Sequence, residues 1–240
     1  MRQITARGLV VATLLTLGSG CSAVAPPPAS ELQKVVKLER ELDKTGDDFD
    51  LRWQLAEACI ELVEHPLTAS ADRLIFSEQA LSHSDRAIAL MPERVEGHFF
   101  RAVSTGHILD NQFLPDLSMI GDLESSGVRA RELDPSFECA GPLLLLALLY
   151  QKAPAWPIGP ELAGEEEEIE ALFREAIRIT PRCVENHIAY AEFLQEEDRL
   201  AEAEESAHRA EALLATAELL PYKRDEFTQR VRELLATSSN

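Results

Sequence analysis

Histidines and clustered glutamates are the residues of this sequence that could do chemistry, as metal ligands or general bases. None of the six histidines stands in a His-Glu-x-x-His pattern, which would place two imidazoles and a base on one helix face. The run from Glu165 to Glu168 would not converge on one metal ion, because consecutive helical side chains point in different directions. Acids are favoured near a helix N-terminus, so the run indicates a solvated first turn. We therefore expect no enzyme, no metal and no cofactor.

Net charge narrows the class of partner. Aspartate and glutamate number 42 against 23 lysines and arginines, which gives a formal charge of −19 over 240 residues. This field repels phosphate, so we expect no nucleic-acid partner, and a basic partner fits better. Only 11 glycines are present, which argues against a β-sandwich or barrel with many tight turns.

Residues 1–20 have the features of a bacterial lipoprotein signal peptide. Two arginines and no acid accompany an apolar stretch from Leu9 to Leu17, which is too short to span a bilayer as a helix. Small residues then precede Cys21, at the position where such signals carry the lipid-modified cysteine, although Gly18 stands where leucine is usual. We predict lipidation of Cys21. The alternatives are ordinary cleavage, which would give a soluble periplasmic protein, and a retained anchor.

The segment 21–31 is rich in proline, alanine and serine, which cannot bury a core, and we interpret it as a semi-rigid tether. Ser22 rather than aspartate follows the cysteine, which favours the periplasmic face of the outer membrane. The tether would join a lipid anchor in the membrane to a repeat domain over 32–220. A C-terminal helix and tail would follow over 221–240.

A helical period runs through the sequence from residue 32, and no alternating pattern predicts a strand. Small residues on the second helix of a pair allow close packing against the first, and a proline then ends that helix. This pattern resembles the tetratricopeptide repeat, which implies an all-α fold of about four helix pairs in a compact solenoid, plus a C-terminal helix. The four segments that carry it are Ala80-x6-Ala87-x4-Pro92, Ala130-x4-Pro135, Phe173-x2-Ala176-x4-Pro181 and Ala203-x6-Ala210.

The middle of the chain carries a more specific pattern. Residues 133–142 read Leu-Asp-Pro-Ser-Phe-Glu-Cys-Ala-Gly-Pro, residues 143–149 are all apolar, and residues 154–159 read Pro-Ala-Trp-Pro-Ile-Gly. Over about residues 85–215 the sequence resembles the T component of tripartite ATP-independent periplasmic (TRAP) transporters, although Leu144 stands where that family has a basic residue. The resemblance implies a periplasmic solute-binding protein as partner and a small apolar or carboxylate solute. The apolar run predicts a helix that is buried centrally.

In tetratricopeptide arrays the first helix of each pair lines a concave groove, and counting back from the prolines predicts which residues face it. Trp53 and Phe99 have an alternative role, which is to fill the space between helices. The predicted groove residues are Asp50, Trp53, Glu57 and Ile60, then Glu96, Phe99 and Val103, then Pro142, Leu146 and Leu149, then Ile188, Glu192 and Gln195.

Three further side chains are candidates for a ligand site. Arg101 stands where the repeat usually has an apolar residue, so it either pairs with an acid or projects into a cavity. Trp156, in the proline-rich loop, either plugs the core or caps a cavity. Tyr150 directly follows the apolar run and joins these candidates.

Three cysteines remain after Cys21: Cys59, Cys139 and Cys183. Their spacing does not indicate zinc, and an odd number leaves at least one thiol free. We interpret them as small buried hydrophobic residues, with a disulfide between Cys139 and Cys183 left open.

Two functions fit these features. The first is a lipid-anchored accessory component of a TRAP-type uptake system, bound to a solute-binding protein. The alternative is a general periplasmic scaffold for assembly of envelope proteins. A groove that holds an extended peptide would favour the scaffold, and a closed cavity would favour the transporter role.

Overall fold

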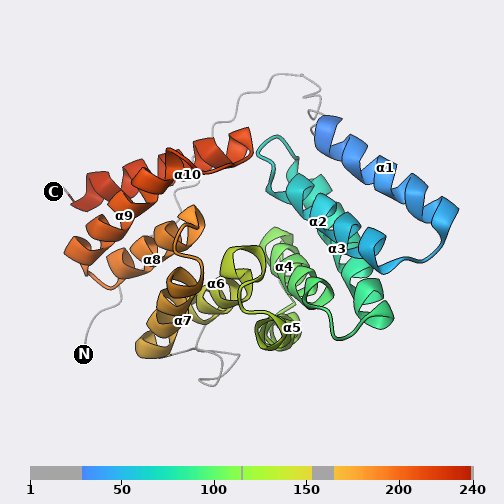
Figure 1. Cartoon of the computed structure of the whole chain (residues 1–240), viewed down its shortest axis with the longest axis horizontal. Coiled ribbons are helices and arrows are strands. Elements are labelled where there is room, and N and C mark those ends of the chain that lie inside the picture. The colour runs from blue at the N-terminus through green and yellow to red at the C-terminus, as the bar shows by residue number, and fades with distance from the viewer. Residues whose placement is uncertain (1–28, 115, 153–164, 239–240) are drawn as a thin grey trace.

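The computed structural model describes residues 29–114, 116–152 and 165–238, and over these ranges it is built from helices (Figure 1). No strand forms among these residues, so the predicted all-α class is confirmed. The signal peptide, Cys21 and Trp156 lie outside the described residues. The helices are α1 (Ala29–Thr45), α2 (Phe49–Glu64), α3 (Ser70–Leu90), α4 (Val95–Asn111), α5 (Met119–Leu133), α6 (Phe137–Lys152), α7 (Glu166–Ile179), α8 (Val184–Glu196), α9 (Leu200–Leu214) and α10 (Pro221–Ser238).

The helices pack as successive hairpins in an inner and an outer layer. Helix α2 pairs with α3, α4 with α5, α6 with α7, and α8 with α9. Each first helix also contacts the next first helix, from α2 through α4 and α6 to α8, and α8 then contacts α10. The first helices therefore form the inner side of an arc, as Figure 1 shows. The predicted solenoid of four helix pairs with a C-terminal helix is confirmed.

Alanine stands where the two helices of a pair approach closely. Ala80, Ala87, Ala130 and Ala176 have no exposed surface. Helices α3, α5 and α7 each end two residues before a proline, which cannot continue a helix and which restricts the residue before it. The spacing of alanine and proline therefore determines both how the outer helices pack and where they end.

Three hydrophobic clusters follow the arc instead of one central core. The first joins α1, α2, α3 and α4, the second joins α6, α7 and α8, and the third joins α8, α9 and α10. Each pair is thus stabilised by its neighbours, as expected for a repeat array.

The two ends of the array differ from the predicted boundaries in one respect. Helix α1 begins at Ala29, inside the segment 21–31 that the sequence predicts to be a tether. Val35 and Leu38 of α1 are buried against α2, which draws this segment into the helix. Helix α10 begins at Pro221, the first residue of the predicted C-terminal segment. None of the helices in the described ranges is both long and apolar enough to cross a membrane.

Candidate binding cavity

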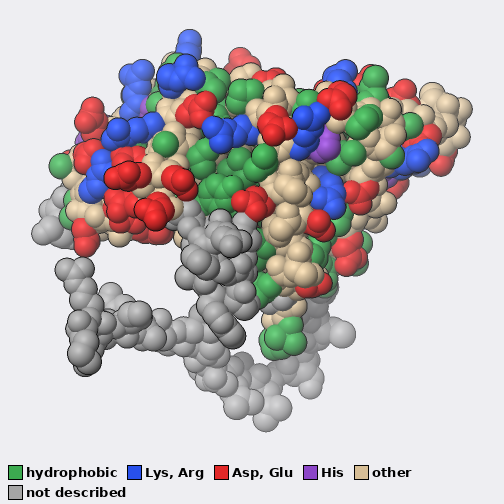
Figure 2. All heavy atoms as spheres, turned by 90° about the horizontal axis from the view of Figure 1, so that it is seen from below, with side chains coloured by type: hydrophobic (Ala, Val, Ile, Leu, Met, Phe, Trp, Pro, Cys, Tyr) green, Lys and Arg blue, Asp and Glu red, His purple; other side chains and the backbone are tan. Residues whose placement is uncertain are grey.

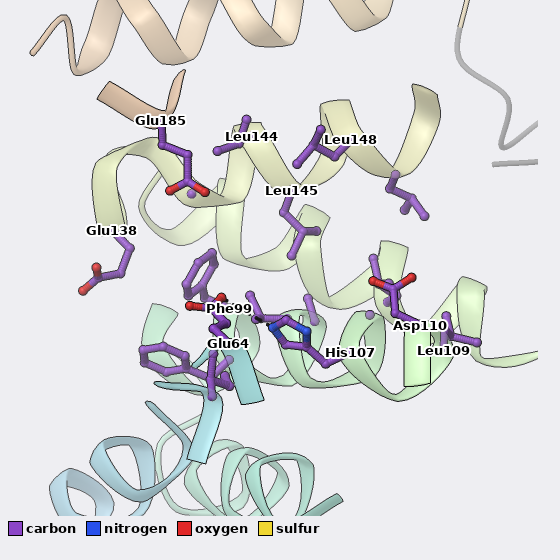
Figure 3. Close-up of a pocket in the computed structure, with 18 of the residues that line it drawn as sticks. Glu64, Phe99, His107, Leu109, Asp110, Glu138, Leu144, Leu145, Leu148 and Glu185 are labelled. Carbon is purple, nitrogen blue, oxygen red and sulfur yellow. Dashed lines mark ion pairs between the residues drawn. The ribbon is translucent and has the colours of Figure 1, made fainter. Parts of the chain in front are cut away.

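A cavity of about 700 Å³ opens on the inner layer of the arc (Figure 3). Its walls come from α2, α4, α5 and α6, and residues of α8 and α10 contribute to its edge. This volume lies within the range of pockets that bind organic molecules or several amino-acid side chains. Leucine, isoleucine and phenylalanine form much of the wall, and acidic residues stand among them.

The apolar stretch of α6 divides between the core and this cavity. Leu143 and Leu146 expose at most 1% of their surface and pack with α7 and α8. Leu145, Leu148 and Leu149 are only partly buried and line the cavity. The sequence predicts a helix buried on all sides, with Leu146 in the groove. The structure differs because α7 and α8 bury one face of α6 completely, whereas α4 and α5 cover the other face only in part.

The start of α6 contains a left-handed turn at the edge of the cavity. Glu138, Cys139 and Ala140 have φ angles of 43°, 62° and 61°, and this conformation costs about 1 kcal/mol or more for each non-glycine residue. The carbonyl oxygen of Cys139 accepts hydrogen bonds from Asn186 Nδ2 at 2.8 Å and from Thr180 Oγ1 at 3.1 Å. Thr180 at the end of α7 and Asn186 of the next hairpin therefore hold the turn, and with it the backbone of Glu138.

Phe99 of α4 lies directly against Gly141 of α6. A Cβ atom at position 141 would stand 2.7 Å from two carbons of the Phe99 ring, so only glycine permits this approach. The same ring packs edge-on against Phe100 and Phe137, with centroids 5.3 and 5.4 Å apart. Phe99 therefore fills the space between helices and also lines the cavity.

An ionic network at Glu64 connects the two ends of the arc. The Glu64 carboxylate lies 3.0 Å from Nζ of Lys223 on α10 and 3.5 Å from Nε2 of His107 on α4. Burial would raise the pKa of Glu64, but the hydrogen bond from His107 and the charge of Lys223 outweigh it and lower the pKa to about 2. Beside this network the rings of His65 and Tyr222 stand 4.8 Å apart. The backbones of α2 and α10 stay apart, so side chains make this connection.

Two other carboxylates of the cavity wall, those of Glu138 and Glu185, have no hydrogen-bond or ion-pair partner among the described residues. Burial raises the pKa of Glu185. Burial and the charge of Glu57 raise the pKa of Glu138. Glu57 and Glu61 differ from them, because both lie close to Lys34, at 3.5 and 2.9 Å.

The predicted groove residues fall into two groups. One group faces the cavity and comes from α2, α4 and α6. The other group packs or pairs elsewhere, and it includes Trp53, Ile188 and Glu192. The predicted residues that line the cavity are Glu57, Ile60, Phe99, Val103 and Leu149.

Trp53 and Tyr150 lie outside the cavity lining. The Trp53 ring stacks on Phe100 with centroids 6.2 Å apart, and its Nε1–H donates to Asp50 at 3.1 Å. The hydroxyl of Tyr150 donates to Glu124 at 2.8 Å, which ties α6 to α5. Both side chains thus serve the packing between helices.

Arg101 also lies outside the cavity and binds acids and hydroxyls of the outer helices. Its Nε donates to Asp85 at 2.8 Å, and its Nη1 donates to the Ser126 hydroxyl at 2.6 Å. The structure therefore assigns Arg101 to pairing between α3, α4 and α5, which is one of its two predicted roles.

Ile188 and Glu192, the candidates on α8, are covered by α10. Ile188 has no exposed surface and lies in the cluster of α8, α9 and α10. Glu192 accepts two hydrogen bonds from Arg230, at 2.7 and 2.8 Å. In this hairpin the inner face is therefore occupied by the chain's own last helix.

Apart from Glu57, the charged residues of the cavity were not predicted from the sequence. A signal existed on α2, where Glu57, Glu61 and Glu64 recur at helical spacing on the inward face. Lys223 and Glu185 gave no such signal, because their neighbours are set by the curvature of the whole array.

Of the three cysteines, Cys139 is exposed and lines the cavity, which corrects the prediction that it is buried, whereas Cys59 and Cys183 are buried as predicted. The Cys139 thiol donates to the sulfur of Cys183, which raises the pKa of Cys139 and lowers that of Cys183, and both thiols are free. Cys59 is buried, and burial raises its pKa to about 12. In the described ranges no three His, Cys, Asp or Glu residues are grouped to hold a metal ion.

The surface is as acidic as the net charge implies. Figure 2 shows acidic side chains gathered at several places on one face of the molecule. Glu165 to Glu168 are all exposed at the beginning of α7, where each side chain can be hydrated. This matches a solvated first turn.

Helix hairpins stacked in an inner and an outer layer define the fold of tetratricopeptide-repeat (TPR) proteins. The chain is similar to the solved structure of TTC0263, a thermophilic TPR protein of Thermus thermophilus, with a TM-score of 0.63 and 18% identity over 84% of this chain and 89% of that one. It also aligns with yeast Tom70, with a TM-score of 0.45 and 17% identity over 88% of this chain and 48% of that one. At such identities the likeness shows the fold alone. No protein-family model and no curated protein matches the sequence.

Proposed function

We propose that this protein is a TPR-type scaffold that binds a segment of a partner protein in the cavity of its inner layer. The observation that supports this most strongly is the apolar face of α6. Leu145, Leu148 and Leu149 leave apolar surface facing an open space of about 700 Å³, and apolar surface of this kind gains free energy when a partner covers it.

Binding without catalysis is the simplest use of this cavity. A catalytic site needs titratable groups that converge on one reacting atom and are free to act on it. His107, Glu64 and Lys223 do converge, but they are engaged with one another. We therefore assign the cavity a binding role.

The cellular setting that we propose comes from the sequence of residues 1–31. A lipid on Cys21 and a tether of proline, alanine and serine would hold the repeat domain at the periplasmic face of the outer membrane. There the protein would serve as a scaffold in the assembly of envelope proteins.

A peptide selection tests the proposed scaffold function. A library of displayed random peptides is selected for binding to the full chain, and the selected peptides are measured against the double variant Leu145→Asp/Leu148→Asp. We expect at least a tenfold loss of affinity, because two charges would enter the apolar wall. The control Leu67→Asp/Ile75→Asp alters exposed apolar residues that do not line the cavity. Peptides that bind the cavity variant as tightly as the parent would refute the proposal.

A second candidate function is the TRAP-type accessory role. One observation favours it: residues 137–149, which are part of the segment that carries the resemblance, supply a wall of the cavity. The acids Glu138 and Glu185 would repel a carboxylate solute, so an apolar solute fits better. Calorimetric titration with short-chain alcohols and carboxylates, together with co-purification of a solute-binding protein, distinguishes this role from the scaffold.

A further inference from the structure

We infer that the segment held in the cavity carries a lysine or arginine flanked by apolar residues, and that Glu185 receives its cationic group, while Glu138 adds negative charge at the same end of the cavity. This inference rests on the proposed scaffold function and specifies the chemistry of the partner. It follows from three observations: the placement of the two carboxylates, their lack of partners, and the apolar wall beside them.

The two carboxylates lie toward the same end of the cavity without contact between them. Figure 3 shows Glu138 of α6 and Glu185 of α8 at the same end of the row formed by Leu144, Leu145 and Leu148. The left-handed turn held by the next hairpin fixes the first, and the first turn of α8 carries the second. Both therefore sit on positions that the fold determines.

The cations nearest to this end are already engaged. Lys223 lies 3.0 Å from Glu64, which also binds His107. Arg230 is held by both carboxylate oxygens of Glu192. No described residue neutralises Glu185 or Glu138 in the same way, so this end of the cavity has unpaired negative charge.

Two other charged groups of the cavity, Lys152 and Asp110, lie away from this end. Lys152 ends α6, at the opposite end of that helix from Glu138. Figure 3 shows Asp110 at the far end of the leucine row as well. The cavity is therefore polarised, with apolar wall along its length and unpaired acid at one end.

A lysine or arginine side chain matches this arrangement. Its methylene stem can lie on Leu144, Leu145 and Leu148 while its charged head reaches the Glu185 carboxylate. Hydrogen bonds between ionised groups are shorter and stronger than neutral ones. Burial already disfavours the ionised form of Glu185 and raises its pKa, so a cation that arrives there relieves an existing cost. An acidic side chain would meet repulsion.

Peptides with one variable position test the inference. The full chain is titrated, by fluorescence anisotropy, with labelled peptides of four leucines around a central lysine, glutamine or glutamate, each with a Gly-Ser tail. We expect the lysine peptide to bind about tenfold tighter than the glutamine peptide, the size of one charge-assisted hydrogen bond. The glutamate peptide should bind weakest.

Glutamate-to-glutamine variants show which carboxylates cause the preference for the lysine peptide. Glu185→Gln should reduce the ratio of lysine affinity to glutamine affinity to about twofold. Glu138→Gln changes an exposed side chain, so it provides a second test in which burial of the carboxylate plays a smaller part. Glu196→Gln on the exposed end of α8 is the matched control and should leave the ratio unchanged. Helicity measured by circular dichroism checks that each variant is folded.

The possible outcomes separate the two proposals. Equal binding of the three peptides to the parent chain would overturn the cation inference and leave the scaffold function standing. Failure of every peptide would contradict the scaffold function itself. Binding of octylammonium, added as a small-molecule probe, in the absence of any peptide binding would overturn the choice of a polypeptide as the occupant.

Discussion

The inner helices of the third and fourth pairs have different surroundings. On α8, Ile188 is fully buried and Glu192 is bound to Arg230, because α10 lies over this helix. On α6, Leu145 and Leu149 are only partly buried and line the cavity, because no helix plays the part of α10 there among the described residues. In a repeat array, therefore, a position binds or packs according to what the chain places over it, and the repeat pattern alone does not decide between the two.

The largest expected effect is a difference in stability between these two pairs. Ile188→Ala should lower the free energy of unfolding by about 3 kcal/mol, because it leaves a cavity in a closed cluster. Leu149→Ala should cost about 1 kcal/mol or less, because that side chain is already partly exposed. Urea unfolding followed by circular dichroism measures both. Equal losses would mean that the α6 face is covered in solution and that the comparison is wrong.

The next effect concerns Glu64, which joins the ends of the arc. Glu64→Gln should lower stability by about 2 kcal/mol at pH 7, since the lowered pKa of about 2 reports a carboxylate stabilised by His107 and Lys223. A lowered folded-state pKa gives stability above the ordinary value of 4.5 and loses it as the pH falls toward about 2. The parent and the variant should therefore converge between about pH 4.5 and pH 2 in thermal unfolding scans. A difference that persists at pH 2 would contradict this assignment.

A smaller effect tests how α10 is fastened to α8. Glu192→Ala should cost about 0.5 to 1 kcal/mol, because the Glu192–Arg230 pair is partly exposed to solvent. In a double-mutant cycle with Arg230→Ala, the two losses should not add. Additive losses would show that the pair contributes nothing to the cover that α10 gives to α8.

The smallest effect has the opposite sign. Glu185→Gln should raise stability by a few tenths of a kcal/mol at pH 7, because burial penalises the ionised carboxyl and raises its pKa. A raised pKa destabilises above that pKa, so the gain should disappear as the pH falls through it and the parent carboxyl takes up a proton. Thermal unfolding at several pH values checks the sign. A loss of stability at pH 7 would show that Glu185 has a stabilising partner.

The sequence was sufficient for the hairpins and insufficient for the contacts between distant pairs. Alanine and proline spacing encodes close packing and helix ends locally, so the layers could be predicted. The left-handed turn at Cys139 depends on Thr180 at the end of α7 and on Asn186 of α8, and no local pattern predicts either contact. Likewise, Glu64 meets Lys223 only because the whole array curves.

The residues of the candidate site also divide into those that local patterns predicted correctly and those whose surroundings depend on distant parts of the chain. Phe99 and Val103 were predicted to face the groove, and they line the cavity because both neighbouring first helices leave that face open. Ile188 and Glu192 were predicted by the same count, and their different surroundings come from α10. Trp156 and Cys21 lie outside the described residues and stay predictions.

The meeting of α2 and α10 through side chains has a mechanical consequence. The two helices could separate without loss of any hydrogen bond within a helix, because Glu64, Lys223, His65 and Tyr222 make the junction while the backbones stay apart. The junction between the ends of the arc therefore rests on an ion pair and one pair of rings. Dissolved salt screens a partly buried pair less than an exposed one, so the ends of the arc should stay joined at ionic strengths that weaken surface ion pairs.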